Sequence, residues 1–148
     1  MFCYGYYDTI KNAEANNIKN EIVYIGKQFI SSELCGLGLS LFGAIIGGKL
    51  APKNAGLGAL GYGFMGMYCG YTIGTSLGTY LSGNNGKYYG SYSSAFIGAI
   101  IGAYVGMKLF QTFDQKGFGS ISLLICAPIG SITGFNLFRK LKQWYSLS

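Results

Sequence analysis

The stretch GMYCGYTIGTSLG at residues 66–78 places a glycine at every fourth position, and the stretch GSYSSAFIGAIIGAYVG at residues 90–106 repeats the spacing with small residues. Residues four apart lie on the same face of a helix, so each stretch presents a face without bulky side chains. Glycine disfavours a helix in water by about 1 kcal/mol relative to alanine. Its repetition is reasonable only where close helix packing compensates, so both stretches predict helices packed backbone against backbone.

The same register of small residues occurs in two further apolar segments, at about 34–51 and 118–138. Small residues every four positions let helices approach closely inside lipid, where little hydrophobic drive brings them together. The register does not distinguish packing within the chain from packing against another chain. The glycines expected on these packing faces are Gly36, Gly43, Gly47, Gly66, Gly70, Gly74, Gly78, Gly90, Gly98, Gly102, Gly106, Gly130 and Gly134.

Charge is scarce and unevenly placed along the 148 residues. Only 11% of residues are charged, against about 25% in ordinary soluble domains. About 20 uncharged helical residues cross a hydrocarbon core of about 30 Å. We therefore predict an all-α membrane bundle of about four glycine-zipper transmembrane helices, with three spans and a re-entrant fourth segment as an alternative. A β-barrel is disfavoured because the apolar runs keep a period of four rather than two. The expected helices cover about 34–51, 57–81, 90–110 and 118–138.

Two terminal regions flank the expected bundle. Residues 1–33 carry isoleucines at helical spacing between polar positions, which predicts an amphipathic helix lying on a membrane surface, docking a partner or covering its own bundle. They lack the continuous apolar core of a cleavable signal peptide, so none is predicted. Residues 139–148 form a basic and aromatic tail. Pro128 is expected to kink the fourth helix or divide it.

The net charge of +6 is interpreted as a set of membrane-edge anchors rather than a nucleic-acid surface. Lysine and arginine at the ends of apolar segments reach lipid headgroups with their charged tips, and tryptophan and tyrosine favour the same depth. With four spans, more cations fall on the side of the two termini, which predicts that both termini face the cytoplasm or matrix. The expected interface residues are Lys49, Lys53, Lys87, Lys108, Arg139, Lys140, Trp144 and Tyr145.

Candidate catalytic chemistry is sparse. The chain has no histidine, which removes the commonest general base and metal ligand. The carboxylates, Glu33 included, are assigned to the ends of the spans or beyond them, so no intramembrane proton carrier is expected. Two GxGxxG strings, at 56–61 and 61–66, lack the downstream acid of a dinucleotide site. We predict no catalytic residue, no metal and no cofactor apart from bound lipid.

Several polar side chains lie within the expected spans. They could line a water-filled path, but such side chains more often bond to a neighbouring helix or to their own backbone, and we favour that interpretation. These residues include Thr72, Thr75, Ser76, Thr79, Thr133 and Asn136.

Residues 70–106, followed by APIGSITGFNLFRK at 127–140, resemble a widespread group of uncharacterised bacterial glycine-zipper membrane proteins. That group shares the glycine run, a short Gly/Asn loop and a closing element. The resemblance implies a membrane of the bacterial envelope and assigns no activity. A weaker resemblance, in architecture alone, to the mitochondrial preprotein translocase family and its complex I accessory subunits implies the mitochondrial inner membrane instead. The closing element is represented here by Pro128, Gly130, Gly134, Phe135, Asn136 and Leu137.

The expected function is that of a non-catalytic structural or accessory subunit of a larger membrane assembly. Its expected partners are membrane lipid and either other membrane subunits or further copies of itself, with no nucleic acid. Two alternatives remain open: a translocation or pore-forming element with a polar groove, and a homo-oligomeric zipper protein that shapes membranes.

Overall fold

The computed structural model describes residues 2–54, 56–84, 88–113 and 119–141. They form an almost entirely helical chain, which confirms the predicted all-helical class. The elements, in order, are α1 (Phe2–Leu50), α2 (Gly58–Gly83), β1 (Tyr88–Tyr89), α3 (Tyr92–Phe113), α4 (Gly119–Leu137) and β2 (Lys140–Leu141).

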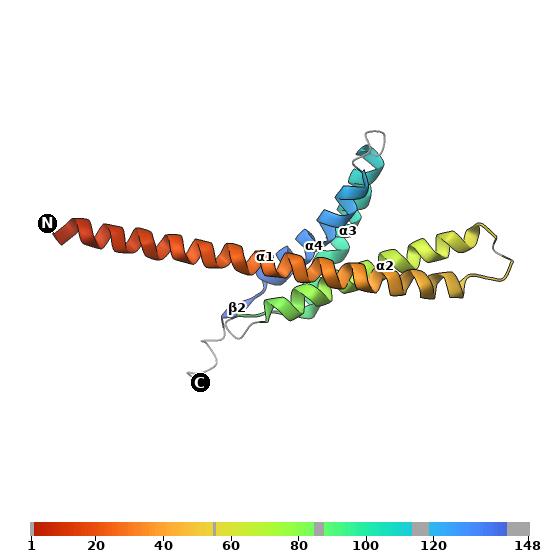
Figure 1. The fold of residues 1–148 in the computed structure, drawn as a ribbon, viewed down its shortest axis with the longest axis horizontal. Helices are drawn as coiled ribbons and strands as arrows, with labels where there is room; N and C mark the ends of the chain where they lie inside the picture. Colours follow the sequence, from red (N-terminus) through yellow and green to blue (C-terminus); the bar gives the residue numbers. More distant parts are fainter. Residues whose placement is uncertain (1, 55, 85–87, 114–118, 142–148) are drawn as a thin grey trace.

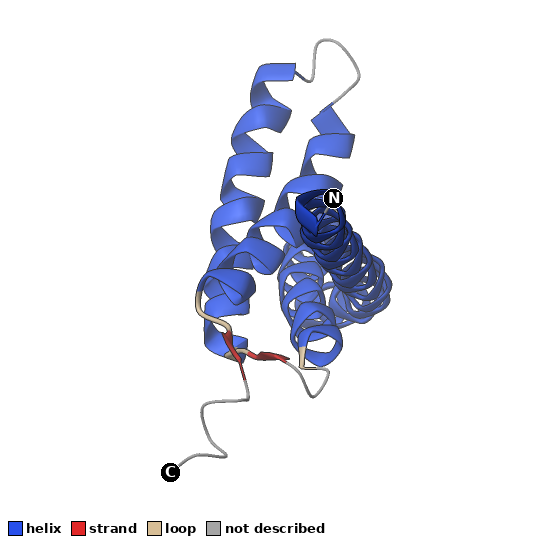
Figure 2. Ribbon diagram, turned by 90° about the vertical axis from the view of Figure 1, so that its left-hand side faces the viewer, coloured by secondary structure: helices blue, strands red, loops and turns tan. Residues whose placement is uncertain are grey.

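The four helices are arranged as two hairpins. Helix α2 runs back along α1, and α4 runs back along α3, so the most extensive contacts lie within each pair. Figure 1 shows the α1–α2 hairpin along the long axis of the molecule and the α3–α4 hairpin rising from its middle at an angle. In the end-on view of Figure 2, α3 and α4 stand side by side next to the α1–α2 pair.

Helix α1 is one continuous helix of 49 residues. At 1.5 Å per residue it is about 74 Å long, more than twice a hydrocarbon core. The sequence predicted an amphipathic segment to residue 33 and a separate span from residue 34, but no helix end separates them. Residues 27–35 contain neither glycine nor proline, so nothing in the local sequence interrupts the helix. Its N-terminal part extends well beyond the other helices (Figure 1).

Pro128 lies inside α4 without dividing it, so the expected division into two shorter helices is not observed. Proline has no N–H, and the carbonyl four residues before it therefore loses its helical donor. That carbonyl belongs to Leu124, and the hydroxyl of Tyr71 on α2 donates to it at 2.8 Å. A side chain from the other hairpin thus replaces the missing backbone hydrogen bond.

Strands β1 and β2 close the end of the molecule where α2, α3 and α4 meet. They pair antiparallel, with Tyr88 opposite Leu141 and Tyr89 opposite Lys140. Asn84 fixes the connection into β1, because its side-chain amide donates to the Tyr80 carbonyl and its side-chain oxygen accepts from the Gly90 N–H, each at 3.0 Å. The chain is thereby held at one shared end of both hairpins.

The polarity of the described residues is inverted relative to a water-soluble globule. Large apolar side chains such as Leu41, Phe42 and Ile46 are 57–67% exposed, whereas Gln28, Ser32 and Thr75 are fully buried. Two of the described segments, Ile18–Leu50 and Tyr92–Thr112, are long and apolar enough to cross a membrane, and a shorter apolar stretch covers Leu124–Leu137.

Candidate functional site

Helices α1 and α2 approach backbone to backbone along one line. A methyl group added to Gly66 would overlap the carbonyl oxygen of Gly43, and one added to Gly43 would overlap that of Gly66. The next glycines along α2 face carbonyls at four-residue steps in the opposite direction on α1. Gly70, Gly74 and Gly78 meet the carbonyls of Leu39, Cys35 and Ser31, respectively, and Gly47 meets that of Tyr62.

Helices α3 and α4 repeat this arrangement. Gly98 and Gly130 oppose each other, so that a methyl group on either would overlap the other's carbonyl oxygen. Gly102 faces the Cys126 carbonyl. Farther toward the connection between the two helices, Ser122 Oγ donates to the carbonyl of Gly106 at 3.1 Å. Both hairpins therefore have antiparallel contacts that recur every four residues.

Two of the predicted packing glycines have different surroundings. Gly36 faces side chains rather than backbone, since an added methyl group would lie 2.8 Å from Thr75 Cγ2 and 2.9 Å from Tyr71 Cε2. Gly90 was expected on the face of a helix but lies just before α3, where it contacts the ring of Phe135. It makes room for an aromatic side chain and is not part of the helix–helix register.

A polar cluster joins the two hairpins at their shared end. We call it the junction cluster and define it as Glu21, Tyr24 and Gln28 of α1, Tyr88 of β1, Asn136 of α4 and Arg139. Arg139 forms an ion pair with Glu21 at 3.0 Å, and its guanidinium carbon lies 4.3 Å from the centre of the Tyr88 ring. The Tyr88 hydroxyl donates to the other Glu21 oxygen at 2.6 Å. Tyr24 donates to the carbonyl of Gly83 at 2.8 Å, which ties in the end of α2.

The inner side of the junction cluster is fully enclosed. Gln28 is completely buried and accepts a hydrogen bond of 2.9 Å from the Asn136 amide. Its own Nε2 atom has no hydrogen-bond partner among the described residues. Phe135, also fully buried, fills the space that Gly83 and Gly90 leave open. A partly polar, tightly packed contact therefore connects α1, α2 and α4.

Arg139 was predicted to reach lipid headgroups, but its side chain takes part in the junction cluster and is only 24% exposed. Burial alone would lower the pKa of this guanidinium, but the hydrogen bond and charge of Glu21 outweigh that effect and raise the pKa. The group is therefore a permanent cation at physiological pH. Its role in the fold is to bind a helix on the opposite hairpin.

A second polar contact lies deeper between the hairpins. Glu33 was assigned to the edge of a span, but the structure places it inside α1, within the apolar segment Ile18–Leu50. Both of its carboxyl oxygens lie 3.1 Å from the hydroxyl of Tyr71. Because Tyr71 also donates to the Leu124 carbonyl of α4, Glu33, Tyr71 and α4 form one connected contact.

The serine and threonine side chains of α2 are bonded to helix backbone. Thr72, Thr75 and Thr79 donate to carbonyls three or four residues earlier in α2, at 2.9–3.0 Å. Across the hairpin, Ser31 Oγ and Ser32 Oγ of α1 donate at 3.1 Å to the carbonyls of Gly78 and Thr75. These hydroxyls therefore have partners within the hairpin and do not depend on water.

Of the remaining predicted interface residues, the structure describes Lys49, Lys53, Lys108 and Lys140. Lys49 and Lys53 are exposed at the connection between α1 and α2, and Lys108 is exposed on α3 with its amine 5.8 Å from the centre of the Tyr104 ring. Lys140 belongs to β2. Lys87, Trp144 and Tyr145 lie outside the described residues.

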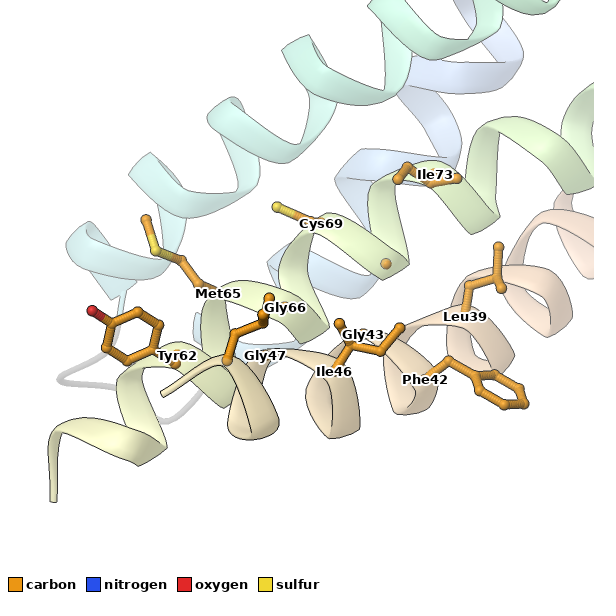
Figure 3. Close-up of a pocket in the computed structure, with 12 residues that line it drawn as sticks. Leu39, Phe42, Gly43, Ile46, Gly47, Tyr62, Met65, Gly66, Cys69 and Ile73 are labelled. Atoms are coloured by element: carbon orange, nitrogen blue, oxygen red, sulfur yellow. The ribbon is translucent and has the colours of Figure 1, made fainter. Parts of the chain in front are cut away.

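Each hairpin carries an apolar groove above its glycine contact. The α1–α2 groove has a volume of about 510 Å³ and is floored by Gly43, Gly66 and Gly70, with Phe42 and Met65 among its walls (Figure 3). The α3–α4 groove, of about 330 Å³, is floored by glycines of both helices. Neither groove contains a charged side chain. They suit hydrocarbon rather than a polar substrate.

No set of three His, Cys, Asp or Glu side chains that could hold a metal ion occurs in the described part of the chain. No protein-family model, curated protein or solved structure matches this chain. The resemblances to bacterial glycine-zipper proteins and to the mitochondrial translocase family therefore stay predictions.

Proposed function

We propose that this chain is a non-catalytic structural or accessory subunit of a larger membrane assembly, built as two glycine-zipper hairpins that cross the bilayer four times. The observation that carries the proposal is the inverted polarity of the bundle. Apolar side chains face outward along the helices, while Ser, Thr and Gln side chains fill the contacts between them.

Water would penalise this surface heavily. Exposed apolar area costs about 25 cal/mol per Å², and contiguous apolar patches beyond a few hundred Å² mark interaction or membrane surfaces. Lipid removes that cost, because acyl chains are as apolar as leucine side chains. Satisfaction of hydroxyl groups within the helices is also what a bilayer interior demands.

The hairpin pairing supports four crossings rather than two. Among the described residues, only α1 and α3 contain segments that are long and apolar enough by composition alone. However, α2 lies antiparallel against α1, and α4 against α3, through backbone contacts that leave no space between the helices. With 26 and 19 residues, α2 and α4 are about 39 Å and 28 Å long, close to the thickness of a hydrocarbon core. Helix α2 would therefore cross the bilayer beside α1, and α4 beside α3.

The surface features favour a subunit over a catalyst. Helix α1 extends beyond the junction cluster and offers a long rod outside the bundle (Figure 1). The two glycine-floored grooves fit an acyl chain or a helix of another subunit, which gives the expected lipid and protein partners a place to bind. On the bacterial resemblance we place the protein in the bacterial envelope, with the mitochondrial inner membrane as the alternative.

Native membranes provide the test. A photo-reactive amino acid at Phe42, on the α1–α2 groove, should give a discrete adduct with a different membrane protein, and the protein should stay in the membrane pellet after alkaline extraction. The same amino acid at Lys53, in the exposed connection, serves as the control. Adducts with a second copy alone would support a homo-oligomer instead. A monomer that crosslinks only to lipid, or extraction into the soluble fraction, would overturn the proposal.

The pore alternative predicts solute flux through liposomes that contain the purified protein. The bonding of the α2 hydroxyls to helix carbonyls argues against it, because those groups would have to face water in an open path. Flux above that of empty liposomes would favour the pore over the subunit.

A further inference from the structure

Tyr71 has one hydroxyl proton but lies within hydrogen-bond distance of two acceptors on two other helices. Its oxygen is 3.1 Å from each carboxyl oxygen of Glu33 on α1 and 2.8 Å from the carbonyl oxygen of Leu124 on α4. A hydroxyl donates only one hydrogen bond but can also accept. The three groups can therefore all be satisfied only if one of the acceptors brings a proton of its own.

The Leu124 carbonyl cannot be that group, and it has a particular need for a donor. In an uninterrupted helix it would accept from the N–H four residues later, but that residue is Pro128, which has none. Tyr71 supplies the replacement at the shortest distance of the three contacts. A carbonyl left without a donor inside lipid is costly, so the Tyr71 proton is best used on α4.

We propose that Glu33 is a proton-binding site between the two hairpins, and that its protonated carboxyl donates to Tyr71 while Tyr71 donates to the Leu124 carbonyl. The proton comes from water, and no electron transfer or other reactant is involved. In this state the chain of hydrogen bonds runs from α1 through α2 to α4. Loss of the proton leaves either the carboxylate or the Leu124 carbonyl without a donor, which weakens the contact between the hairpins.

The charges around Glu33 are consistent with this assignment. Neither Gly58–Gly83 of α2 nor Gly119–Leu137 of α4 contains a charged residue, and α3 contains only Lys108. Tyr68 packs against the buried cluster that contains Tyr71, and a tyrosine is neutral at physiological pH. On α1 the charges that precede Glu33 most closely in sequence are Lys27 and Glu21, and Glu21 is ion-paired with Arg139.

An unpaired carboxylate in an apolar setting is strongly disfavoured, and ionisable residues inside membrane segments commonly serve proton binding or transfer. Sequence reasoning did not indicate such a role, because the carboxylate was assigned to the end of a span. The inference goes beyond the proposed function. It depends on the contact between the hairpins and not on any partner subunit.

Infrared spectroscopy of the purified full-length protein in lipid nanodiscs tests the protonation state directly. At pH 7 the wild type should show a carboxylic-acid C=O band that disappears in Glu33→Gln and decreases when the pH of the wild type is raised. Glu21→Gln, which removes the ion-paired carboxylate, should leave the band in place. A wild-type spectrum without this band at pH 7, or a band that survives Glu33→Gln, would overturn the proposal.

Thermal unfolding tests the coupling to the hairpins. The melting temperature of the wild type should fall as Glu33 loses its proton, whereas Glu33→Gln should remove this pH dependence because the glutamine amide still donates to Tyr71. Tyr71→Phe should lower the melting temperature at low pH and also remove the dependence. Tyr62→Phe, on an exposed part of the same helix, is the matched control and should behave as wild type. If the melting temperature of Glu33→Gln falls with rising pH as much as that of the wild type, the inference is contradicted.

Discussion

The two hairpins reach the same backbone-to-backbone approach with different sequences. In α3–α4, the contact is made largely of glycine opposite glycine or a small residue, and the helices carry apolar side chains outward. In α1–α2, two serines of α1 also donate to carbonyls of α2 along the contact. In α3–α4, a bond of this kind runs from Ser122 to the Gly106 carbonyl, toward the connection between the helices. Helix α3 contains a span recognisable by hydropathy, but α2 does not.

The difference shows that close approach and apolar composition are separate properties. Hydropathy reports the whole circumference of a helix, so hydroxyl and tyrosine side chains lower the value for α2. The packing of α2 depends only on one face, where the glycines at every fourth position carry no side chain. Since the hydroxyls are bonded within the hairpin, a polar composition need not mean contact with water.

The largest expected effect comes from filling a glycine contact. Gly66→Leu in α2 or Gly130→Leu in α4 would drive a side chain into the backbone of the partner helix, which no change of rotamer can relieve. We expect each to cost about 3 kcal/mol of unfolding free energy, the upper end of ordinary overpacking. Equal losses in the two hairpins would show that the shared contact dominates both.

Gly48→Leu is the matched control for these substitutions. This glycine lies on α1, and a methyl group added to it would have no neighbouring atom within 4 Å, so the same change meets open space. Thermal or denaturant unfolding in detergent micelles measures all three variants. Because leucine forms helices better than glycine, helix propensity alone predicts no loss at Gly48; a loss there comparable to that at Gly66 would contradict the explanation by close approach.

An intermediate effect is expected at the junction cluster, which belongs to both hairpins. Arg139→Gln removes the ion pair with Glu21 and the contact with the Tyr88 ring. The side chains of Arg139 and Glu21 are 24% and 36% exposed, respectively, so the ion pair is neither fully exposed nor fully buried. We therefore expect a loss of about 1–2 kcal/mol. Arg139→Lys should recover only part of it, since lysine lacks the planar fork of donors.

Lys108→Gln is the control for the junction variant, because Lys108 is exposed and its amine lies over the face of an exposed tyrosine. Its unfolding free energy should change by less than about 0.5 kcal/mol. If the two hairpins of Arg139→Gln melt in separate steps, the junction cluster couples them in the wild type. An unchanged single transition would contradict that role.

The smallest effect is expected from a single hydroxyl that bonds across the α1–α2 contact. Ser32→Ala removes one hydrogen bond to the Thr75 carbonyl, and such interhelical bonds average about 0.6 kcal/mol in membrane proteins. Ser94→Ala on α3 is the control, because that hydroxyl bonds locally, to the carbonyl of Ser91 just before α3. The unfolding free energy should fall more in Ser32→Ala than in Ser94→Ala. Losses of equal size would mean that the bond between the helices adds no more stability than a local one.

The sequence predicted the helical elements well because their signals are local. Uncharged length and four-residue spacing predicted α2, α3 and α4 to within a few residues at each end. The predictions failed where the outcome depended on distant contacts. Pro128 was expected to kink or divide α4; the division is not observed, and Tyr71 of the other hairpin supplies a donor to the carbonyl that proline leaves free. Gly90 matched the register by spacing, although it lies outside α3 and accommodates Phe135.

In the candidate site, too, local features could be predicted from the sequence, whereas contacts between distant segments could not. The positions of the small residues follow from sequence, because a repeat of four defines one helix face. Their pairing does not follow, since the register between two helices depends on which faces meet. The junction cluster could not be predicted either, because Glu21 and Arg139 are separated by most of the chain. The only sequence signal was their charge, and that of Arg139 was interpreted as membrane anchoring.

Helices with glycine faces and an apolar exterior follow from the amino-acid sequence alone, because composition and spacing act within each segment. The packing of the α2 glycines against α1, and of the α3 glycines against α4, follows only from the folded arrangement of the helices. The same holds for the ion pair of Arg139 with Glu21 and for the position of Glu33 between the hairpins. The physical reason is that a hydrogen bond or a close approach requires two partners, and one helix face does not specify which face it will meet.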